Sequence, residues 1–266
     1  MKIHEAIADH YGPMTAKTYD GIAKKLFWGY PETLSAIAAE AVYARRSSFD
    51  AVPRIRTILD IGIGTGNVSL RLIEELRRAS AYAPGPDGPA PDVIVYGLDS
   101  SSHMSQVASD KLSALPGVQI DFRLGEIREV ARLFDGLKFD CIVSGFAIHH
   151  LDPSEKAALM RDLRGMLNPG GMLVIGDRMP PEEEIEAHAR PGYHAVIASR
   201  WLELFEGAEK RPTLSKAMSD LDEAFAADGD KPSSAAAHLG WLRDAGFSDA
   251  RSPFHSFGCG VVSGTC

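Results

Sequence analysis

Residues 57–66 read Thr-Ile-Leu-Asp-Ile-Gly-Ile-Gly-Thr-Gly, an apolar run that ends in an acid and passes directly into three alternating glycines. Gly62, Gly64 and Gly66 allow the backbone to turn sharply and leave room where a Cβ would collide with a ligand. The residues that follow repeat apolar side chains at helical spacing, so a helix begins behind the turn. A strand, a glycine turn and a helix in this order predict a cofactor site of the nucleotide-binding type.

The spacing of the glycines separates the candidate cofactors. The dinucleotide fingerprint requires G-x-G-x-x-G, whereas this chain has Asn67 at the last position and Asp60 before the first glycine. This disfavours a nicotinamide-dependent oxidoreductase, which stays an alternative. A glycine turn in some other α/β protein is the second alternative, because one short motif carries little weight until its context agrees.

Later segments repeat the pattern of an apolar strand with a polar tip. Residues 93–99 are almost all apolar and end in Asp99, where a carboxylate can accept hydrogen bonds from two ribose hydroxyls. Ser100–Ser102 supply N-cap candidates for a helix that contains Met104. Residues 118–123 alternate apolar and polar side chains, as a strand with one exposed face does, and lead into Gly125-Glu126-Ile127.

In their order along the chain, these segments resemble the class I S-adenosylmethionine-dependent methyltransferases. Residues 139–151 resemble the fourth strand of that family with the segment after it, Asn168–Asp177 its turn and fifth strand, and residues 241–264 its closing helix and antiparallel strand pair. The resemblance implies S-adenosyl-L-methionine as the cofactor. It also implies an α/β, Rossmann-like fold with a seven-stranded, mostly parallel sheet in the order 3-2-1-4-5-7-6, helices on both faces and a helical cap.

The N-terminal segment narrows this likeness. Tyr19-Asp20 and a turn at Gly29-Tyr30, ahead of a helix, resemble the group near the TehB-like and wobble-uridine tRNA methyltransferases. In such enzymes the N-terminal helices fold over the cofactor, so Tyr19 is a candidate for contact with its carboxylate. The alternative is that Tyr19 and its aromatic neighbours are core residues of a covering helix.

The resemblance assigns cofactor binding to residues at the strand ends. Asp60 is expected near the ammonium and sulfonium groups, and Glu126 beside the adenine amine, where the family more often has Asp. The whole set of cofactor candidates is Tyr19, Asp60, Gly62, Gly64, Gly66, Asp99, Ser100, Met104, Glu126, Ile127 and Ser144.

Methyl transfer is an in-line displacement at a sulfonium carbon, so the protein chiefly aligns the nucleophile and excludes water. A general base is needed only when the nucleophile arrives protonated. His149 and His150 follow the fourth strand and are candidate bases or orienting residues. The candidates for contact with the acceptor are Tyr30, Asp177, Arg178, His194 and Trp201. For Asp177 and Arg178 the alternative is an ion pair that closes the strand.

The composition of the chain limits the classes of binding partner that we expect. The 266 residues carry a net charge of −8, which argues against a broad phosphate-binding surface. A small-molecule acceptor is therefore expected, with a tRNA acceptor or a non-catalytic cofactor-binding protein as alternatives and a homodimer left open. No metal site is expected, because the nine histidines form no H-E-x-x-H pattern and the adjacent His149 and His150 are a poor pair for one ion.

The chain shows no apolar run of the ~20 residues that a membrane span needs. It also shows no secretion-signal layout and no metal-ligand spacing among its three cysteines, so the cytoplasm is the expected location. Three parts are predicted: residues 1–50 as an N-terminal helical cap over the cofactor, residues 51–179 with 239–266 as the Rossmann-like core, and residues 180–238 as a helical insertion that forms a substrate cap.

Overall fold

The described part of the chain forms one seven-stranded sheet. The computed structural model describes residues 13–26, 29–44, 55–82, 92–180, 229–256 and 258–266, together with 195, 199, 202, 213–216 and 219. The strands are β1 (Thr57–Ile61), β2 (Val93–Asp99), β3 (Val118–Leu124), β4 (Phe139–Gly145), β5 (Leu167–Arg178), β6 (Ser248–Ser256) and β7 (Cys259–Thr265). Their order is β3-β2-β1-β4-β5-β7-β6, and β7 is antiparallel to both of its neighbours. The expected order is confirmed.

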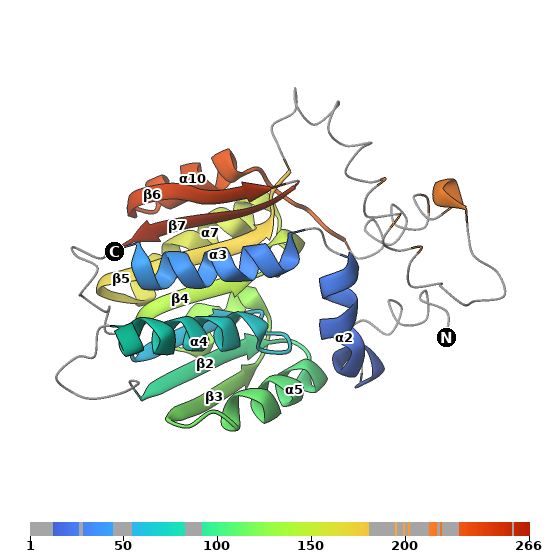
Figure 1. Ribbon diagram of the computed structural model, residues 1–266. Coiled ribbons are helices and arrows are strands. Elements are labelled where there is room, and N and C mark those ends of the chain that lie inside the picture. The colour runs from blue at the N-terminus through green and yellow to red at the C-terminus, as the bar shows by residue number, and fades with distance from the viewer. Residues whose placement is uncertain are drawn as a thin grey trace.

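Helices cover both faces of the sheet (Figure 1). The two cores follow from strand alternation: in β1, Ile58 packs with the helices of the first face, while Leu59 and Ile61 pack with those of the second. The first face carries α3 (Tyr30–Tyr43), α4 (Asn67–Tyr82) and α5 (Ser102–Ser113), and the second α6 (Val130–Leu133), α7 (Pro153–Met166) and α10 (Ala235–Asp244). A further helix, α2 (Pro13–Leu26), contacts α5 and α3.

The central strand explains why the opening motif is apolar throughout. From Ile58 to Ile61 every residue of β1 is fully buried, because β2 and β4 flank it in parallel and helices lie over both faces. The helix expected behind the glycine turn is α4, and the helix expected after Asp99 is α5. Ser101 caps α5, since its Oγ accepts a hydrogen bond from the backbone N–H of Met104 at 3.3 Å.

The predicted turn at residues 168–171 lies inside a strand. Phe139 pairs with Leu167 and Cys141 with Met172, so β5 contains a bulge of extra residues opposite β4. Gly170 has a positive φ of 74°, and the Asn168 side chain donates to Asp140 at 2.7 Å. β5 therefore pairs with β4 before and after this segment, although the composition of the segment is typical of a turn.

The three predicted parts of the chain stay a prediction. Most of the insertion expected at residues 180–238 lies outside the described residues. Within the expected N-terminal cap, α3 packs on the sheet, where a Cβ on Gly176 would lie 2.5 Å from Ile37 Cδ1. Among the described helices, none has the length and apolarity required to cross a membrane.

Candidate functional site

The three glycines of the turn have positive φ values of 66°, 52° and 78° at Gly62, Gly64 and Gly66. A Cβ on Gly62 would overlap the side chain of Ala147, in the segment after β4. A Cβ on Gly66 would lie 3.1 Å from that of Ala108 in α5. Gly62 therefore allows the turn to approach the end of β4, whereas Gly66 allows close packing of two helices.

A cavity of about 320 Å³ lies over this turn. Its lining includes most of the predicted cofactor residues, one predicted acceptor residue and one of the two histidines: Tyr19, Tyr30, Gly62, Gly64, Asp99, Ser100, Met104, Glu126, Ile127 and His150. The other lining residues were not singled out as binding residues from the sequence: Ile63, Thr65, Asn67, Val68, Gly125, Arg128, Gly145, Phe146, Ala147 and Leu151. The volume lies within the usual range for small-ligand pockets.

Asp99 is fixed at the tip of β2. Its Oδ2 accepts a hydrogen bond from the backbone N–H of Gly64 at 2.8 Å, and its Oδ1 accepts one from Ser101 at 2.9 Å. Burial raises the pKa of this carboxyl, although the donating amides act in the opposite direction. Glu126 caps the turn Ile127–Glu129 in a capping box with Glu129. Both predicted acids therefore border the cavity in defined positions.

Asp60, Gly66 and Ser144 do not line the cavity. The Asp60 carboxylate is fully buried, and its Oδ2 accepts a hydrogen bond from Ser69 Oγ at 2.6 Å. Its Oδ1 has no hydrogen-bond partner among the residues that the structure describes, and burial raises the pKa of Asp60 to about 7. Ser144 Oγ donates to the Ile61 carbonyl at 2.8 Å. These side chains lie behind the glycine turn, and contact of Asp60 with a ligand stays a prediction.

Asp20 links α2 to the glycine turn and to α5. Its Oδ1 accepts hydrogen bonds from Thr65 Oγ1 at 2.6 Å and Asn67 Nδ2 at 2.8 Å, and its Oδ2 lies 2.9 Å from Lys111 Nζ. Asn67 also donates to Tyr30 Oη at 3.0 Å. Burial alone would raise the pKa of Asp20, but these donors outweigh it and the pKa is lowered. Asn67, used above only to exclude a dinucleotide motif, is therefore a central residue of this network.

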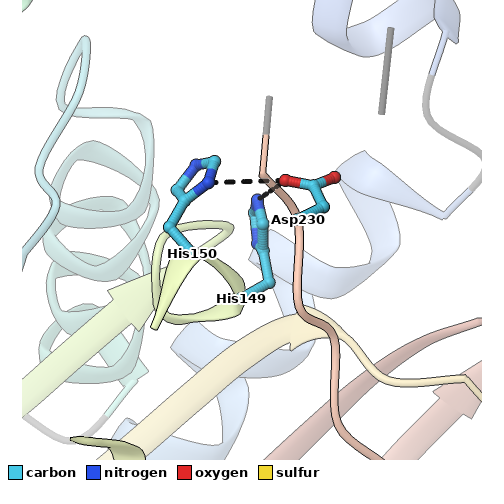
Figure 2. A group of neighbouring side chains, drawn as sticks. All are labelled: His149, His150 and Asp230. Atoms are coloured by element: carbon cyan, nitrogen blue, oxygen red, sulfur yellow. Dashed lines mark ion pairs between the residues drawn. The ribbon is translucent and has the colours of Figure 1, made fainter. Parts of the chain in front are cut away.

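A second polar cluster lies beside the cavity, where β4 and β5 end. His149 Nδ1 lies 2.5 Å from Asp177 Oδ1, and His149 Nε2 lies 3.3 Å from Asp230 Oδ1. His150 Nδ1 lies 3.4 Å from the same oxygen of Asp230 (Figure 2). The Arg178 guanidinium pairs with the other oxygen, Oδ2. His150 lines the cavity and His149 is buried beside it.

The alternative of an Asp177–Arg178 ion pair is wrong for this structure: Asp177 pairs with His149, and Arg178 with Asp230. Successive side chains of a strand point to opposite faces, which separates neighbours. Burial alone would lower the pKa of His149, but the nearby Asp177 carboxylate outweighs it and raises that pKa. The pKa of Asp177 is lowered by the same pairing, against the effect of burial.

The geometric reason for expecting no metal site does not hold. The short turn Ile148–His150 brings the two imidazole rings to a centroid separation of 4.2 Å, and ligand atoms of His149, His150 and Asp230 all lie within 4.8 Å of one another. Asp230 was missed because nothing in the sequence around it marks it as a site residue, and it joins the site only through the fold. His194 and Trp201 lie outside the described residues.

Comparison with known proteins gives the same family as the sequence motifs, the methyltransferases. Residues 58–171 match the methyltransferase domain family. The chain is 22% identical to a carboxy-S-adenosyl-L-methionine synthase of Helicobacter hepaticus over 243 residues, which cover 90% of this chain and 86% of that protein. That match does not test the narrower likeness to the TehB-like group.

Solved structures share the fold. Magnesium protoporphyrin IX methyltransferase of Synechocystis PCC 6803, with bound SAH, aligns with a TM-score of 0.58 and 16% identity over 97% of this chain and 96% of that one. An O-methyltransferase family protein of Burkholderia thailandensis aligns with a TM-score of 0.58 and 15% identity over 88% of this chain, which spans 55% of that protein's length. The glycine turn, the acids at the strand tips, the sheet order and the relatives agree: the chain is a class I S-adenosylmethionine-dependent methyltransferase.

Proposed function

We propose that the chain transfers a methyl group to a small-molecule acceptor by in-line displacement within the cavity over the glycine turn. One observation carries the proposal: the same cavity is lined by the turn on one side and by the segment after β4, from Phe146 to Leu151, on the other. Tyr19 of α2 borders it as well. The methyl donor and the acceptor would then meet in one small compartment that can hold the two reacting groups in line.

The residues at the turn fit S-adenosylmethionine. Gly62 and Gly64 line the cavity with backbone alone, which leaves their peptide groups open to a ligand. Asp60 lies behind the turn, and its Oδ1 accepts no hydrogen bond from the residues that the structure describes. This oxygen is available to accept one from a donor group of the cofactor. Asp99 and Glu126 suit the ribose hydroxyls and the adenine amine. When bound, the cofactor supplies an electrophilic methyl group on a sulfonium.

The protein's part in the reaction is to position groups and exclude water. Tyr30 and Phe146 pack with ring centroids 5.0 Å apart and form an aromatic wall of the cavity. His150 lines the same cavity, and we assign it the role of orienting the acceptor. Asp177 fixes the neighbouring His149 and is a positioning residue. An aromatic wall and a fixed imidazole suit a planar or polar small molecule.

The charges around the cavity favour a small acceptor over tRNA. Arg128 is the only Lys or Arg among the lining residues described, and it pairs with Glu155 at 3.1 Å. Asp99 and Glu126 are acids on the same lining. Recognition of a nucleic-acid backbone requires several cations that neutralise phosphates, so this rim is poorly suited to it.

The test is to follow the label of methyl-labelled S-adenosylmethionine in the presence of a filtered metabolite extract or of bulk tRNA. We expect label in the small-molecule fraction with the wild-type chain and with Gly240→Ala, a substitution with nothing within 4 Å of the new Cβ. Gly62→Ala should abolish it. Label that enters tRNA and not the metabolite fraction would contradict the proposal.

A further inference from the structure

We propose that His149, His150 and Asp230 together bind a divalent transition-metal ion of the zinc class. The binding site is argued from its own geometry. The role that we give to the ion, to hold an oxygen of the acceptor, rests on the proposed function.

The three ligand atoms converge on a common point. Asp230 Oδ1 lies 3.3 Å from His149 Nε2 and 3.4 Å from His150 Nδ1 (Figure 2). One ligand atom from each of the three residues lies within 4.8 Å of the other two. Ligands placed about 2.1 Å from a tetrahedral zinc ion are about 3.4 Å apart, so the two separations from Asp230 Oδ1 fit such an ion.

Neighbouring residues already orient these ligands. Asp177 Oδ1 lies 2.5 Å from His149 Nδ1, so this nitrogen carries the ring proton that it shares with the carboxylate, and Nε2 is left 3.3 Å from Asp230 Oδ1 as the ligating atom. A carboxylate behind a ligating histidine is the usual arrangement in metal sites, where it fixes the tautomer and orients the ring. Arg178 pairs with Asp230 Oδ2 and leaves Oδ1 as the single ligating oxygen.

The buried state of Asp230 supports the same site independently of the distances. The side chain is only 6% exposed, and Oδ1 accepts no hydrogen bond from the part of the chain that the structure describes. The imidazole nitrogens of His149 and His150 lie 3.3 and 3.4 Å from it without forming a hydrogen bond. A buried carboxylate oxygen without a hydrogen bond is costly, and a cation between Oδ1 and the two nitrogens removes that cost.

The surrounding charges favour a borderline metal over a hard one. The carboxylates of Asp177 and Asp230 are balanced by Arg178 and by Lys156, whose ammonium donates to Ser233 Oγ at 2.9 Å and to the Lys231 carbonyl. The site therefore offers little excess negative charge to Mg²⁺ or Ca²⁺. Two imidazoles and one carboxylate suit Zn²⁺, Fe²⁺ or Co²⁺.

His150 connects this site to the cavity, because it belongs to the site and also lines the cavity. Three protein ligands leave a coordination position for an oxygen ligand. An ion held here would polarise and position an acceptor oxygen beside the aromatic wall. The acceptor class that follows is an oxygen-bearing small molecule.

The experiment uses the tag-free full chain, stripped with a chelator and titrated with Co²⁺, Zn²⁺ or Mg²⁺. We expect one Co²⁺ or Zn²⁺ per chain, no binding of Mg²⁺, and a Co²⁺ spectrum without thiolate charge-transfer bands. His150→Gln and Asp230→Asn should each weaken binding by about tenfold or more. His103→Gln, on the exposed face of α5, is the matched control and should bind as the wild type does.

Binding of S-adenosylhomocysteine by Asp230→Asn shows that the variant is folded, because Asp230 does not line the cavity. No stoichiometric Co²⁺ or Zn²⁺ binding, or equal binding by Asp230→Asn and His103→Gln, would overturn the inference. Methylation of tRNA would overturn the proposed function instead, whatever the metal titrations show.

Discussion

The Asp177 carboxylate holds His149 with both of its oxygens: Oδ2 accepts a hydrogen bond from the His149 backbone N–H at 2.9 Å, and Oδ1 lies 2.5 Å from the ring Nδ1. This double contact ties the end of β5 to the turn after β4. It fixes the position of one imidazole, and with it the turn that presents His150 to the cavity.

Asp177→Ala should lower the free energy of unfolding by about 3–5 kcal/mol, because removing one partner of a buried pair leaves the other uncompensated. Urea denaturation measures this. The control is Glu74→Ala, which removes an exposed pair with Arg71 and should cost less than about 1 kcal/mol. Equal costs for the two variants would show that the Asp177 contact does not stabilise the fold.

Gly62→Ala should weaken binding of S-adenosylhomocysteine by at least about tenfold, or about 1.4 kcal/mol. The new Cβ would overlap Ala147 and require an unfavourable positive φ, so the turn must move away from the end of β4. Calorimetry on the folded variant measures the affinity. Gly240→Ala in α10 should bind normally. Normal binding by Gly62→Ala as well would show that the turn is not part of the cofactor site.

Asp99→Asn should weaken binding of S-adenosylhomocysteine by about 1–3 kcal/mol, since it removes a charged acceptor from the ribose hydroxyls and from the amides of Gly64 and Ser101. The control is Asp110→Asn, an exposed acid of α5 that does not line the cavity. Unchanged affinity in Asp99→Asn would show that the Asp99 carboxylate takes no part in cofactor binding.

Asp20→Ala should speed dissociation of S-adenosylhomocysteine and expose α2 to proteases. The substitution removes the acceptor that Thr65, Asn67 and Lys111 share, which frees α2 from the glycine turn. Stopped-flow dissociation and limited proteolysis provide the two readouts. Lys24→Ala, on the exposed side of α2, is the control, and identical behaviour of both variants would argue against this link.

Asp60 should make stability depend on pH. Its pKa is raised from 3.8 to about 7 in the folded chain, so the folded state binds the proton more tightly than the unfolded state. The stabilisation is then fully present below about pH 4 and is lost as the pH rises through about 7. Urea denaturation across this window should show a smaller decline for Asp60→Asn than for the wild type. The exposed control Asp162→Asn should follow the wild type, and an unaltered slope in Asp60→Asn would contradict the assignment.

The fold and the cofactor half of the site could be predicted because their signals are local. Parallel strands bring their carboxyl ends to one edge of the sheet, so Asp99 and Glu126 could be placed beside the glycine turn from their positions after apolar runs. The bulge in β5 could not be predicted, because its residues have the composition of a turn.

The second cluster depends on long-range contacts. Asp230 reaches His149 from a segment about eighty residues further along the chain, and no spacing rule connects them. The roles of Asn67 and Lys111 likewise need the position of α2, which no periodicity gives. Sequence patterns report which residues end a strand, but not which distant side chain meets them.

The central claim is that the cavity over the glycine turn binds S-adenosylmethionine, and calorimetry with S-adenosylhomocysteine against NADH tests it most directly. The account predicts saturable binding of S-adenosylhomocysteine at one site per chain, weakened at least about tenfold in Gly62→Ala, and no heat from NADH. Binding of NADH with no binding of S-adenosylhomocysteine would contradict it.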